Sequence, residues 1–180
     1  LRPHPQGGDT IDYNDAEAVQ CLNQALMCHS HGLTAWRVPS GHLCPAIPGR
    51  VDYLCHLSDL LSRDIDSEPI KGIQILDIGT GATCVYPLLA ATHFGWKCVA
   101  TESNADALAW ARKQIDAHPR WSNVVECRHQ LNPNHIFSGV AKPDEKFSAS
   151  LCNPPFYLSL EDAQKHTRLG KETGELSKDA

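Results

Sequence analysis

The sequence predicts an α/β fold in which a parallel-stranded sheet is flanked by helices. From residue 73 onwards, short apolar runs rich in β-branched residues alternate with segments of helical periodicity. Glycine, proline or a helix-capping residue bounds each of these runs. Strands that alternate with helices in this way usually pair in parallel through right-handed crossovers.

Four strands and two helices are expected in this region. The strands are predicted at residues 73–78, 96–101, 124–128 and 147–152. One helix is expected at residues 84–93, where Pro87 is tolerable only in the first turn. The other begins after Asn104, whose side chain suits an N-cap, and ends near Ala117. This core is predicted to occupy residues 71–160.

Residues 1–70 are predicted to form a largely helical extension. Residues 1–13 are expected to be an extended lead-in, and Asp15 suits the N-cap of a helix that ends near His31. Residues 32–49 contain six glycines and prolines, so we expect an ordered loop there, followed by a second helix over 50–63. The inward faces of the two helices are predicted to carry Ala16, Val19, Leu22, Ala25 and Leu26 in the first, and Val51, Leu54, Leu57, Leu60 and Leu61 in the second.

The composition fits one domain, or one domain with an extension, because the chain has 180 residues, 42% of them hydrophobic and 21% charged. It argues against wholesale disorder, collagen and coiled coil. No apolar run reaches the roughly 18–20 residues of a membrane span, and the first ten residues do not resemble a signal peptide. We therefore expect a soluble cytoplasmic protein. Residues 161–180 are expected to be a polar loop or a disordered tail.

Charge and cysteine content narrow the expected partners. The net charge of −5 and the absence of a basic stripe argue against a strong, sequence-independent grip on nucleic acid, although a site that reads a single base stays open. The eight cysteines form no C-x-x-C pair, which favours free thiols over disulfides. Cys84, Cys98 and Cys152 are expected to be small buried side chains. No metal site is expected, because no second ligand pair follows Cys28, His29 and His31.

The first feature with chemical meaning is the segment from Asp77 through Gly79 to Gly81, directly after the first core strand. Glycines at a strand-to-helix turn let a ligand approach the backbone near a helix N-terminus. The third glycine of the dinucleotide-binding pattern is missing, so a tight turn without a ligand is the alternative.

The second feature is Glu102, at the end of the second core strand and 21 residues after Gly81. An acidic side chain there can accept hydrogen bonds from both ribose hydroxyls of a nucleoside-bearing cofactor. The alternative is a carboxylate that faces solvent. The glycine turn upstream favours the ribose interpretation.

The third feature is Asn153-Pro154-Pro155-Phe156, at the end of the fourth core strand. Prolines cannot donate backbone hydrogen bonds, so their carbonyls are left free to accept. The Asn153 amide both donates and accepts, and Phe156 offers a face for stacking. Together they suit a planar amine such as the exocyclic N6 of adenine. A Pro-Pro strand terminator is the alternative.

These features, together with residues 42–53 (HLCPAIPGRVDY), 76–87 (LDIGTGATCVYP) and 151–156 (LCNPPF), resemble a known family. The chain resembles the class I S-adenosylmethionine-dependent methyltransferases of the Asn-Pro-Pro-aromatic type. More closely, it is similar to the bacterial 23S rRNA adenine N6-methyltransferases, which are related to the eukaryotic U6 snRNA adenine N6-methyltransferases. The chain has Val51 and Thr83 where that family usually has alanine and asparagine.

The resemblance implies a Rossmann-like fold, S-adenosyl-L-methionine as cofactor with S-adenosyl-L-homocysteine as product, and RNA as substrate, most specifically 23S rRNA. It implies no metal and no membrane, and it leaves the oligomeric state open. Asn153, Pro154, Pro155 and Phe156 would hold the target base. The residues expected at the cofactor are Arg50, Asp77, Gly79, Gly81, Thr83, Glu102 and Asn132. Of these, Arg50 would reach the methionine carboxylate, and Asn132 would lie near the adenine.

The resemblance also implies seven strands, of which the sequence supplies four, so the C-terminal strands are expected to be missing from this chain. Two other functions therefore stay open. One is an N-methyltransferase that acts on a small-molecule amine or a protein amide. The other is an inactive fragment that binds the cofactor.

Overall fold

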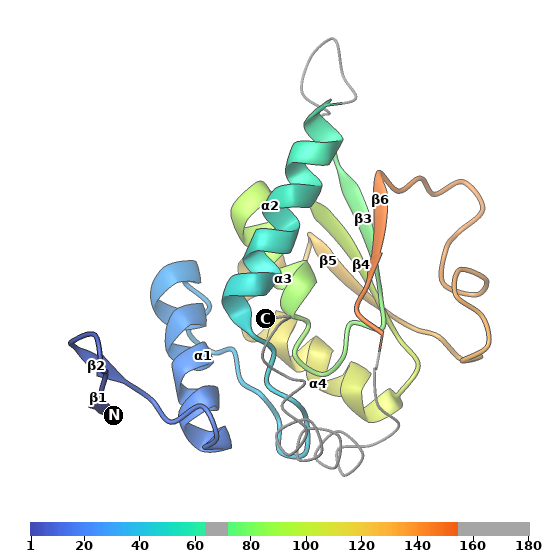
Figure 1. Cartoon of the computed structure of the whole chain (residues 1–180). Helices are drawn as coiled ribbons and strands as arrows, with labels where there is room; N and C mark the ends of the chain where they lie inside the picture. Colours follow the sequence, from blue (N-terminus) through green and yellow to red (C-terminus); the bar gives the residue numbers. More distant parts are fainter. Residues whose placement is uncertain (64–71, 155–180) are drawn as a thin grey trace, which may run out of the picture.

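A computed structural model describes residues 1–63 and 72–154. Its main sheet has four parallel strands in the order β5-β4-β3-β6 (Figure 1). The strands are β3 (Gln74–Ile78), β4 (Lys97–Glu102), β5 (Val125–His129) and β6 (Ala149–Cys152). Each of the four predicted strands is confirmed, with bounds that shift by one or two residues. The expected α/β fold with a parallel sheet is therefore confirmed.

Two helices connect the neighbouring strands. These are α3 (Val85–Phe94), between β3 and β4, and α4 (Ala105–Asp116), between β4 and β5. As predicted, Asn104 caps α4, and its side chain accepts hydrogen bonds from two backbone N–H groups of the first turn. A short 3-10 helix, η1 (Pro119–Trp121), follows α4. Seven consecutive residues of α3 are buried, because this helix lies between the sheet and the N-terminal helices.

The N-terminal segment supplies α1 (Ala16–His31) and α2 (Ile47–Arg63), which lie beside α3 (Figure 1). Asp15 caps α1, as predicted. The expected start of α2 at Arg50 is wrong, because the helix begins three residues earlier. Pro48 lies in its first turn, where a missing N–H costs nothing. The expected lead-in contains a small hairpin of β1 (Arg2–Pro3) and β2 (Asp9–Thr10).

The core lies on the helix-bearing face of the sheet. It joins α1, α2 and the loop between them to α3, α4 and the strands through Met27, Trp36, Leu54, Leu89, Ile75 and Ile115. Four predicted core positions are wrong. Ala16, Ala25 and Leu60 are exposed, because the buried stripes of α1 and α2 pass through Asn23, Met27 and Leu54 instead. Cys152 is also exposed, whereas Cys84 and Cys98 are buried as expected, and all eight cysteines are free.

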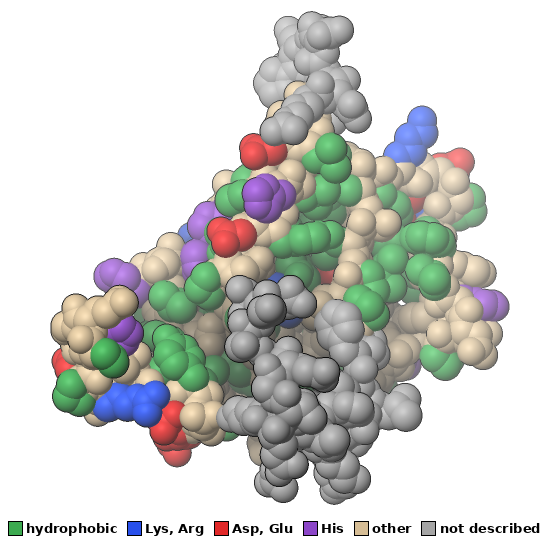
Figure 2. All heavy atoms as spheres, viewed as in Figure 1, with side chains coloured by type: hydrophobic (Ala, Val, Ile, Leu, Met, Phe, Trp, Pro, Cys, Tyr) green, Lys and Arg blue, Asp and Glu red, His purple; other side chains and the backbone are tan. Residues whose placement is uncertain are grey.

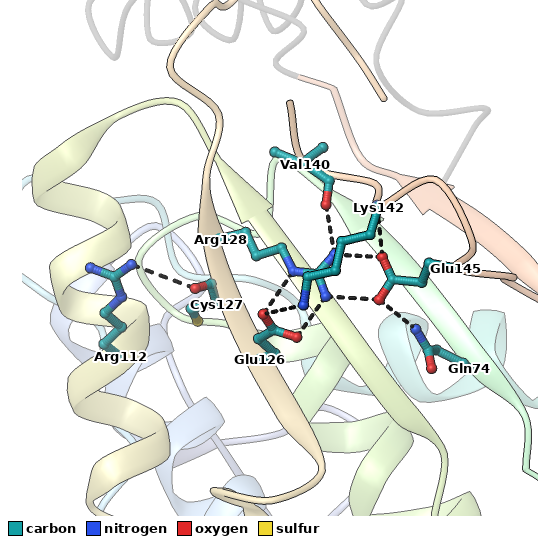
Figure 3. A network of polar contacts seen from close by, with 8 residues as sticks. All are labelled: Gln74, Arg112, Glu126, Cys127, Arg128, Val140, Lys142 and Glu145. Atoms are coloured by element: carbon teal, nitrogen blue, oxygen red, sulfur yellow. Dashed lines mark hydrogen bonds and ion pairs between the residues drawn. The ribbon is translucent and has the colours of Figure 1, made fainter. Parts of the chain in front are cut away.

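The opposite face of the sheet carries polar residues of β3 and β5 under the loop that joins β5 to β6. Arg128 forms ion pairs with Glu126 and Glu145, each at 2.6 Å, and donates to the carbonyl of Val140. Glu145 in turn accepts a hydrogen bond from Gln74 on β3. Figure 3 shows these side chains converging from two strands and the loop. Residues 130–148, which join β5 to β6, contain no helix. The contacts of Arg128 with Glu145 and Val140 therefore hold this loop to the sheet.

Two further observations concern the surface. Among the residues described, no helix is long and apolar enough to cross a membrane. On the face drawn in Figure 2, the Lys and Arg side chains of residues 1–63 and 72–154 are scattered and form no stripe. This arrangement agrees with the absence of a basic stripe in the sequence.

Candidate functional site

The features singled out in the sequence meet at the carboxyl-terminal edge of the sheet. Parallel pairing places Ile78 beside Thr101 on one side and Cys152 on the other. The segments that follow these strands, which begin with the glycine turn, Glu102 and Asn153, therefore lie along one edge. Ligands of open α/β sheets bind at this edge, where the strand order reverses. Here the reversal is at β3, between β4 and β6.

The glycine turn has the conformation that its sequence predicts. Gly79 and Gly81 have φ values of +72° and +66°, which a side chain would strain. A Cβ atom at either position would meet no other atom within 4 Å, so open space lies beside the backbone. The turn can therefore admit a ligand close to its peptide groups.

Glu102 fastens this turn to the end of β4. Its Oε2 accepts a hydrogen bond from the Gly81 N–H at 2.9 Å. Its Oε1 accepts from the N–H groups of Ser103 and Asn104, at 2.8 and 2.9 Å. The Ser103 hydroxyl also donates to Oε1, at 3.5 Å. Oε2 accepts only the bond from Gly81 among the described residues, and a carboxylate oxygen has about two acceptor positions, so Oε2 keeps capacity for a hydroxyl group of a ligand.

Asp77, the fourth residue of β3, is a buried carboxylate beneath the turn. It is 1% exposed, and its Oδ2 has no hydrogen-bond partner among the described residues. Burial, with a smaller contribution from the charge of Glu102, raises the pKa of Asp77 to about 7. A buried acceptor without a partner costs free energy unless a ligand supplies one.

Arg50 presents the complementary feature from α2. Its Nε is buried and has no partner in the part of the chain that the structure describes. Its guanidinium lies 5.4 Å from the ring centre of Tyr86 on α3. Burial raises the pKa of Tyr86, and the nearby charge of Asp77 raises it slightly, whereas the Arg50 cation opposes the rise. The charges of Arg50 and Asp77 therefore act on the pKa of the same tyrosine in opposite directions.

The remaining predicted residues are distributed as follows. Thr83 is buried, and its carbonyl accepts a hydrogen bond from the indole of Trp36 at 2.9 Å. Asn153 and Pro154 are exposed at the end of β6. Pro155 and Phe156 lie outside the described residues, so the structure says nothing of them.

Asn132 lies in the loop that follows β5. It is exposed after β5, and its Oδ1 accepts a hydrogen bond from the Asn134 N–H of its own loop. Its backbone N–H donates to the side chain of Gln130, which is 7% exposed. The structure brings the Gln130 backbone, rather than the Asn132 side chain, next to Glu102, because the Gln130 N–H donates to the Glu102 carbonyl at 2.9 Å.

Sequence reasoning missed Trp36 and Tyr86 as members of this region. Trp36 lies in the segment identified only as an ordered loop, and Tyr86 lies in an apolar helix. A tryptophan within a loop rich in Gly and Pro was the available signal for Trp36. Nothing in the sequence pairs Tyr86 with Arg50, because they are brought together only by the packing of α2 on α3. Among the residues described, no group of three or more His, Cys, Asp or Glu side chains could hold a metal ion.

Known proteins resemble nearly the whole length of this chain. A family model described as RNA methyltransferase matches residues 1–179. Ribosomal RNA large subunit methyltransferase F of Cronobacter sakazakii is 42% identical over 164 residues, which cover 91% of this chain and 53% of that protein. The protein of the same name from Aeromonas salmonicida is 42% identical over 178 residues, which cover 95% and 56%. The chain thus spans about half the length of the curated relatives it matches.

Solved structures give the same result for the fold. The N-terminal domain of human METTL16 matches with a TM-score of 0.76 at 26% identity, and the match covers 95% of this chain and 67% of that one. Its complex with SAH matches with a TM-score of 0.75 at 25% identity, over 95% and 68%. The METTL16 catalytic domain in complex with the MAT2A 3'UTR hairpin 6 matches with a TM-score of 0.71 at 26% identity, over 92% and 54%.

These matches confirm both the resemblance seen in the sequence motifs and the Rossmann-like class I methyltransferase fold. The matched region includes the glycine turn, Glu102 and the Asn153-Pro154 end of β6. The chain belongs to the RNA methyltransferase family.

Proposed function

We propose that this chain binds S-adenosylmethionine and directs methyl transfer to the exocyclic N6 amine of an adenosine in RNA, with 23S rRNA as the substrate. The observation that carries the cofactor part of the proposal is the pair of unpartnered buried atoms, Arg50 Nε and Asp77 Oδ2. One is a cationic donor and the other is an acceptor. Arg50 lies over the Tyr86 ring, and the charge of Asp77 also influences the pKa of that tyrosine.

An α-amino acid head group matches this pair. Its carboxylate would accept hydrogen bonds from the guanidinium of Arg50, and its ammonium would donate to the buried Oδ2 of Asp77. The ammonium would also favour the ionised form of Asp77, whose pKa is raised in the chain without a ligand. S-adenosylmethionine carries such a head group, a ribose and an adenine in one molecule.

The rest of the cofactor would extend along the edge of the sheet. Its ribose would donate to the free acceptor position on Oε2 of Glu102, and Gly79, Gly81 and Thr83 would line the methionine and sugar. Its adenine would approach the loop from Gln130 to Asn132. The METTL16 domain in complex with SAH, which shares this fold, supports the proposal.

The target adenine would enter at the end of β6. The Asn153 side chain and the Pro154 carbonyl would accept hydrogen bonds from the two N–H groups of the amine. These bonds would direct the nitrogen lone pair towards the methyl group of the cofactor. Phe156 would stack on the base. The sulfonium of the bound cofactor supplies the methyl group. The amine nitrogen would form the new bond to that methyl as the bond to sulfur breaks, and the proton would then leave to water. The site therefore acts by alignment and by placed acceptors.

RNA as the substrate is supported by relatives. Ribosomal RNA large subunit methyltransferase F matches over most of this chain, and a METTL16 catalytic domain has been solved with an RNA hairpin. The base must leave its stack to reach the site, which favours a single-stranded or bulged adenosine. We place the reaction in the cytoplasm, a reducing compartment that suits eight free cysteines.

Transfer of labelled methyl from S-adenosylmethionine to 23S rRNA that lacks the modification tests this proposal. The expected result is N6-methyladenosine in digested RNA for the parent chain, and a loss of at least about a hundredfold for Asn153→Ala. Asn123→Ala is the matched control, because Asn123 is exposed just before β5, at the opposite edge of the sheet. Equal rates for Asn153→Ala and Asn123→Ala would contradict the assigned base site.

The same assay separates the alternatives. Methyl transfer to free amines or protein amides, with none to RNA, would favour the second enzyme class. Binding of S-adenosylhomocysteine without any transfer would favour a fragment that only holds the cofactor. Calorimetry that detects no binding at millimolar S-adenosylhomocysteine would overturn the cofactor assignment itself.

A further inference from the structure

We propose that Trp36 is a positioning residue of the cofactor site, which it serves by holding the last peptide group of the glycine turn. The inference deepens the proposed function and rests on it. Trp36 is fully buried, and its indole N–H donates to the Thr83 carbonyl at 2.9 Å across 47 residues of sequence. The loop before α2 thereby contacts the turn that would bind the cofactor.

The peptide group held by Trp36 is in a strained part of the backbone. The residue that follows Thr83 is Cys84, whose φ of 49° and ψ of 36° lie in the left-handed region. It is the one residue other than glycine with a positive φ among those described. Such a conformation costs free energy and persists where its surroundings fix it. Cys84 also precedes α3 and caps it without a side-chain hydrogen bond. The bond from Trp36 to the preceding carbonyl is therefore one of the contacts that hold this segment.

Trp36 can act in this way because its own backbone is held on both sides. The Ala35 N–H donates to Nε2 of His118 at 3.3 Å. The side chain of Gln114 accepts from the Arg37 N–H at 3.1 Å and donates to the Arg37 carbonyl. His118 Nδ1 pairs with the Gln114 carbonyl at 2.7 Å, which leaves Nε2 as an acceptor. Both His118 and Gln114 are buried.

The contacts form one continuous path through the site. Gln114 lies in α4 and His118 lies two residues beyond its end, and α4 begins three residues after Glu102. Glu102 holds Gly81 on one side of the turn, and Trp36 holds Thr83 on the other. The turn is therefore fixed at both ends by buried or half-buried side chains, and loss of the indole N–H would release one end.

Trp36→Phe tests this inference, because phenylalanine keeps an aromatic ring and removes the donor. The Thr83 carbonyl would be left buried without a partner, and we expect the Kd for S-adenosylhomocysteine to rise about tenfold. Hydrogen exchange of the amides in residues 79–85 should accelerate in the same variant without ligand. Trp110→Phe is the matched control, since Trp110 is on the surface of α4, and its Kd should stay within about twofold of the parent value.

A second variant keeps the inference testable if Trp36→Phe misfolds. Gln114→Met keeps the length of the side chain and removes both bonds to Arg37, so we expect a weaker change in the same direction, about threefold in Kd. Calorimetry is done at a temperature where circular dichroism shows each variant folded. Unchanged Kd and unchanged exchange in folded Trp36→Phe would overturn the positioning role, whereas lower thermal stability with unchanged Kd would make it merely structural. A parent chain that binds no S-adenosylhomocysteine would instead overturn the proposed function, and the positioning role with it.

Discussion

The Gly81 amide donates a hydrogen bond to Oε2 of Glu102 at 2.9 Å, which ties the turn after β3 to the end of β4. The other oxygen of this carboxylate accepts from two further backbone amides. Glu102 therefore shapes the site as well as offering acceptors to a ribose. A change at this residue should affect every ligand that uses the nucleoside part of the site.

The first prediction concerns Glu102→Gln. The glutamine amide keeps the shape but places an NH₂ group against at least one backbone N–H, so at least one of the hydrogen bonds to Gly81, Ser103 and Asn104 is lost. We expect the affinities for S-adenosylhomocysteine and for 5′-methylthioadenosine, which lacks the amino acid part, both to fall by at least about tenfold in calorimetry. Glu17→Gln, exposed in the first turn of α1, serves as the control. Intact binding of 5′-methylthioadenosine would remove Glu102 from the nucleoside site.

The second prediction concerns Arg50→Lys, which should discriminate between the same two ligands. Lysine keeps the charge but loses the planar fork that matches a carboxylate and the stacking on Tyr86. The affinity for S-adenosylhomocysteine should fall about tenfold or more, while 5′-methylthioadenosine binds as before. Arg112→Lys, on the exposed side of α4, should change neither affinity. Equal losses for both ligands would show that Arg50 acts on the fold rather than on the amino acid group.

Much of the fold and of the site could be predicted because local chemistry determined it. The caps at Asp15 and Asn104, the β-branched run of β3 and the positive φ of Gly79 and Gly81 each depend on neighbouring residues. The sequence spacing of Gly81 and Glu102 also indicated their proximity, because a strand–helix–strand unit returns the chain to the same edge of the sheet.

The features that escaped prediction depend on packing between distant segments. Leu60 continues the apolar pattern of α2 yet is 60% exposed, so that periodicity did not show where the buried stripe of the helix ends. Thr83, which accepts the hydrogen bond from Trp36, is 47 residues away in the sequence, and Gln114 is 77 residues from its partner Arg37. No local pattern indicates such a contact. The polar pairing of Gln74 with Glu145 was hidden for the same reason.

The third prediction concerns Asp77→Asn and the pH dependence of stability. Burial raises the pKa of Asp77 from an ordinary value of 3.8 to about 7, so the folded chain binds this proton more tightly than the unfolded chain. The free energy of unfolding should therefore fall as the pH rises from about 4 to 7. Asparagine removes this loss. The variant should be more stable than the parent at pH 8, by about 1–3 kcal/mol, and nearly equal at pH 4.

Urea denaturation of both chains at the two pH values provides the measurement. Asp59→Asn, exposed on α2, controls for the loss of one negative charge and should show no such dependence. The stabilised Asp77→Asn chain should nevertheless bind S-adenosylhomocysteine at least about tenfold more weakly, because it lacks the anion for the ammonium. Tight binding by this variant would contradict the assigned role of Asp77.

The fourth prediction concerns Glu145→Gln in the ion-pair network under the loop between β5 and β6 (Figure 3). Hydrogen bonds from Arg128 hold the pKa of Glu145 at about 2, below its ordinary value of 4.5. This carboxylate therefore stabilises the fold above pH 4.5, and its contribution is lost as the pH falls towards 2. The side chains of Arg128 and Glu145 are only 11% and 14% exposed, so solvent screens the pair less than a surface ion pair.

Glu145→Gln should lower the free energy of unfolding by about 1–2 kcal/mol at pH 7, and this difference should shrink as the pH falls towards 2. Hydrogen exchange in residues 130–146 should accelerate, because Arg128 would lose its main link to the loop. Glu126→Gln is a matched control on the same arginine. Its side chain is 53% exposed, so its loss should cost less than about 0.5 kcal/mol. Equal costs for the two substitutions would mean that burial of the Arg128–Glu145 pair does not determine its contribution.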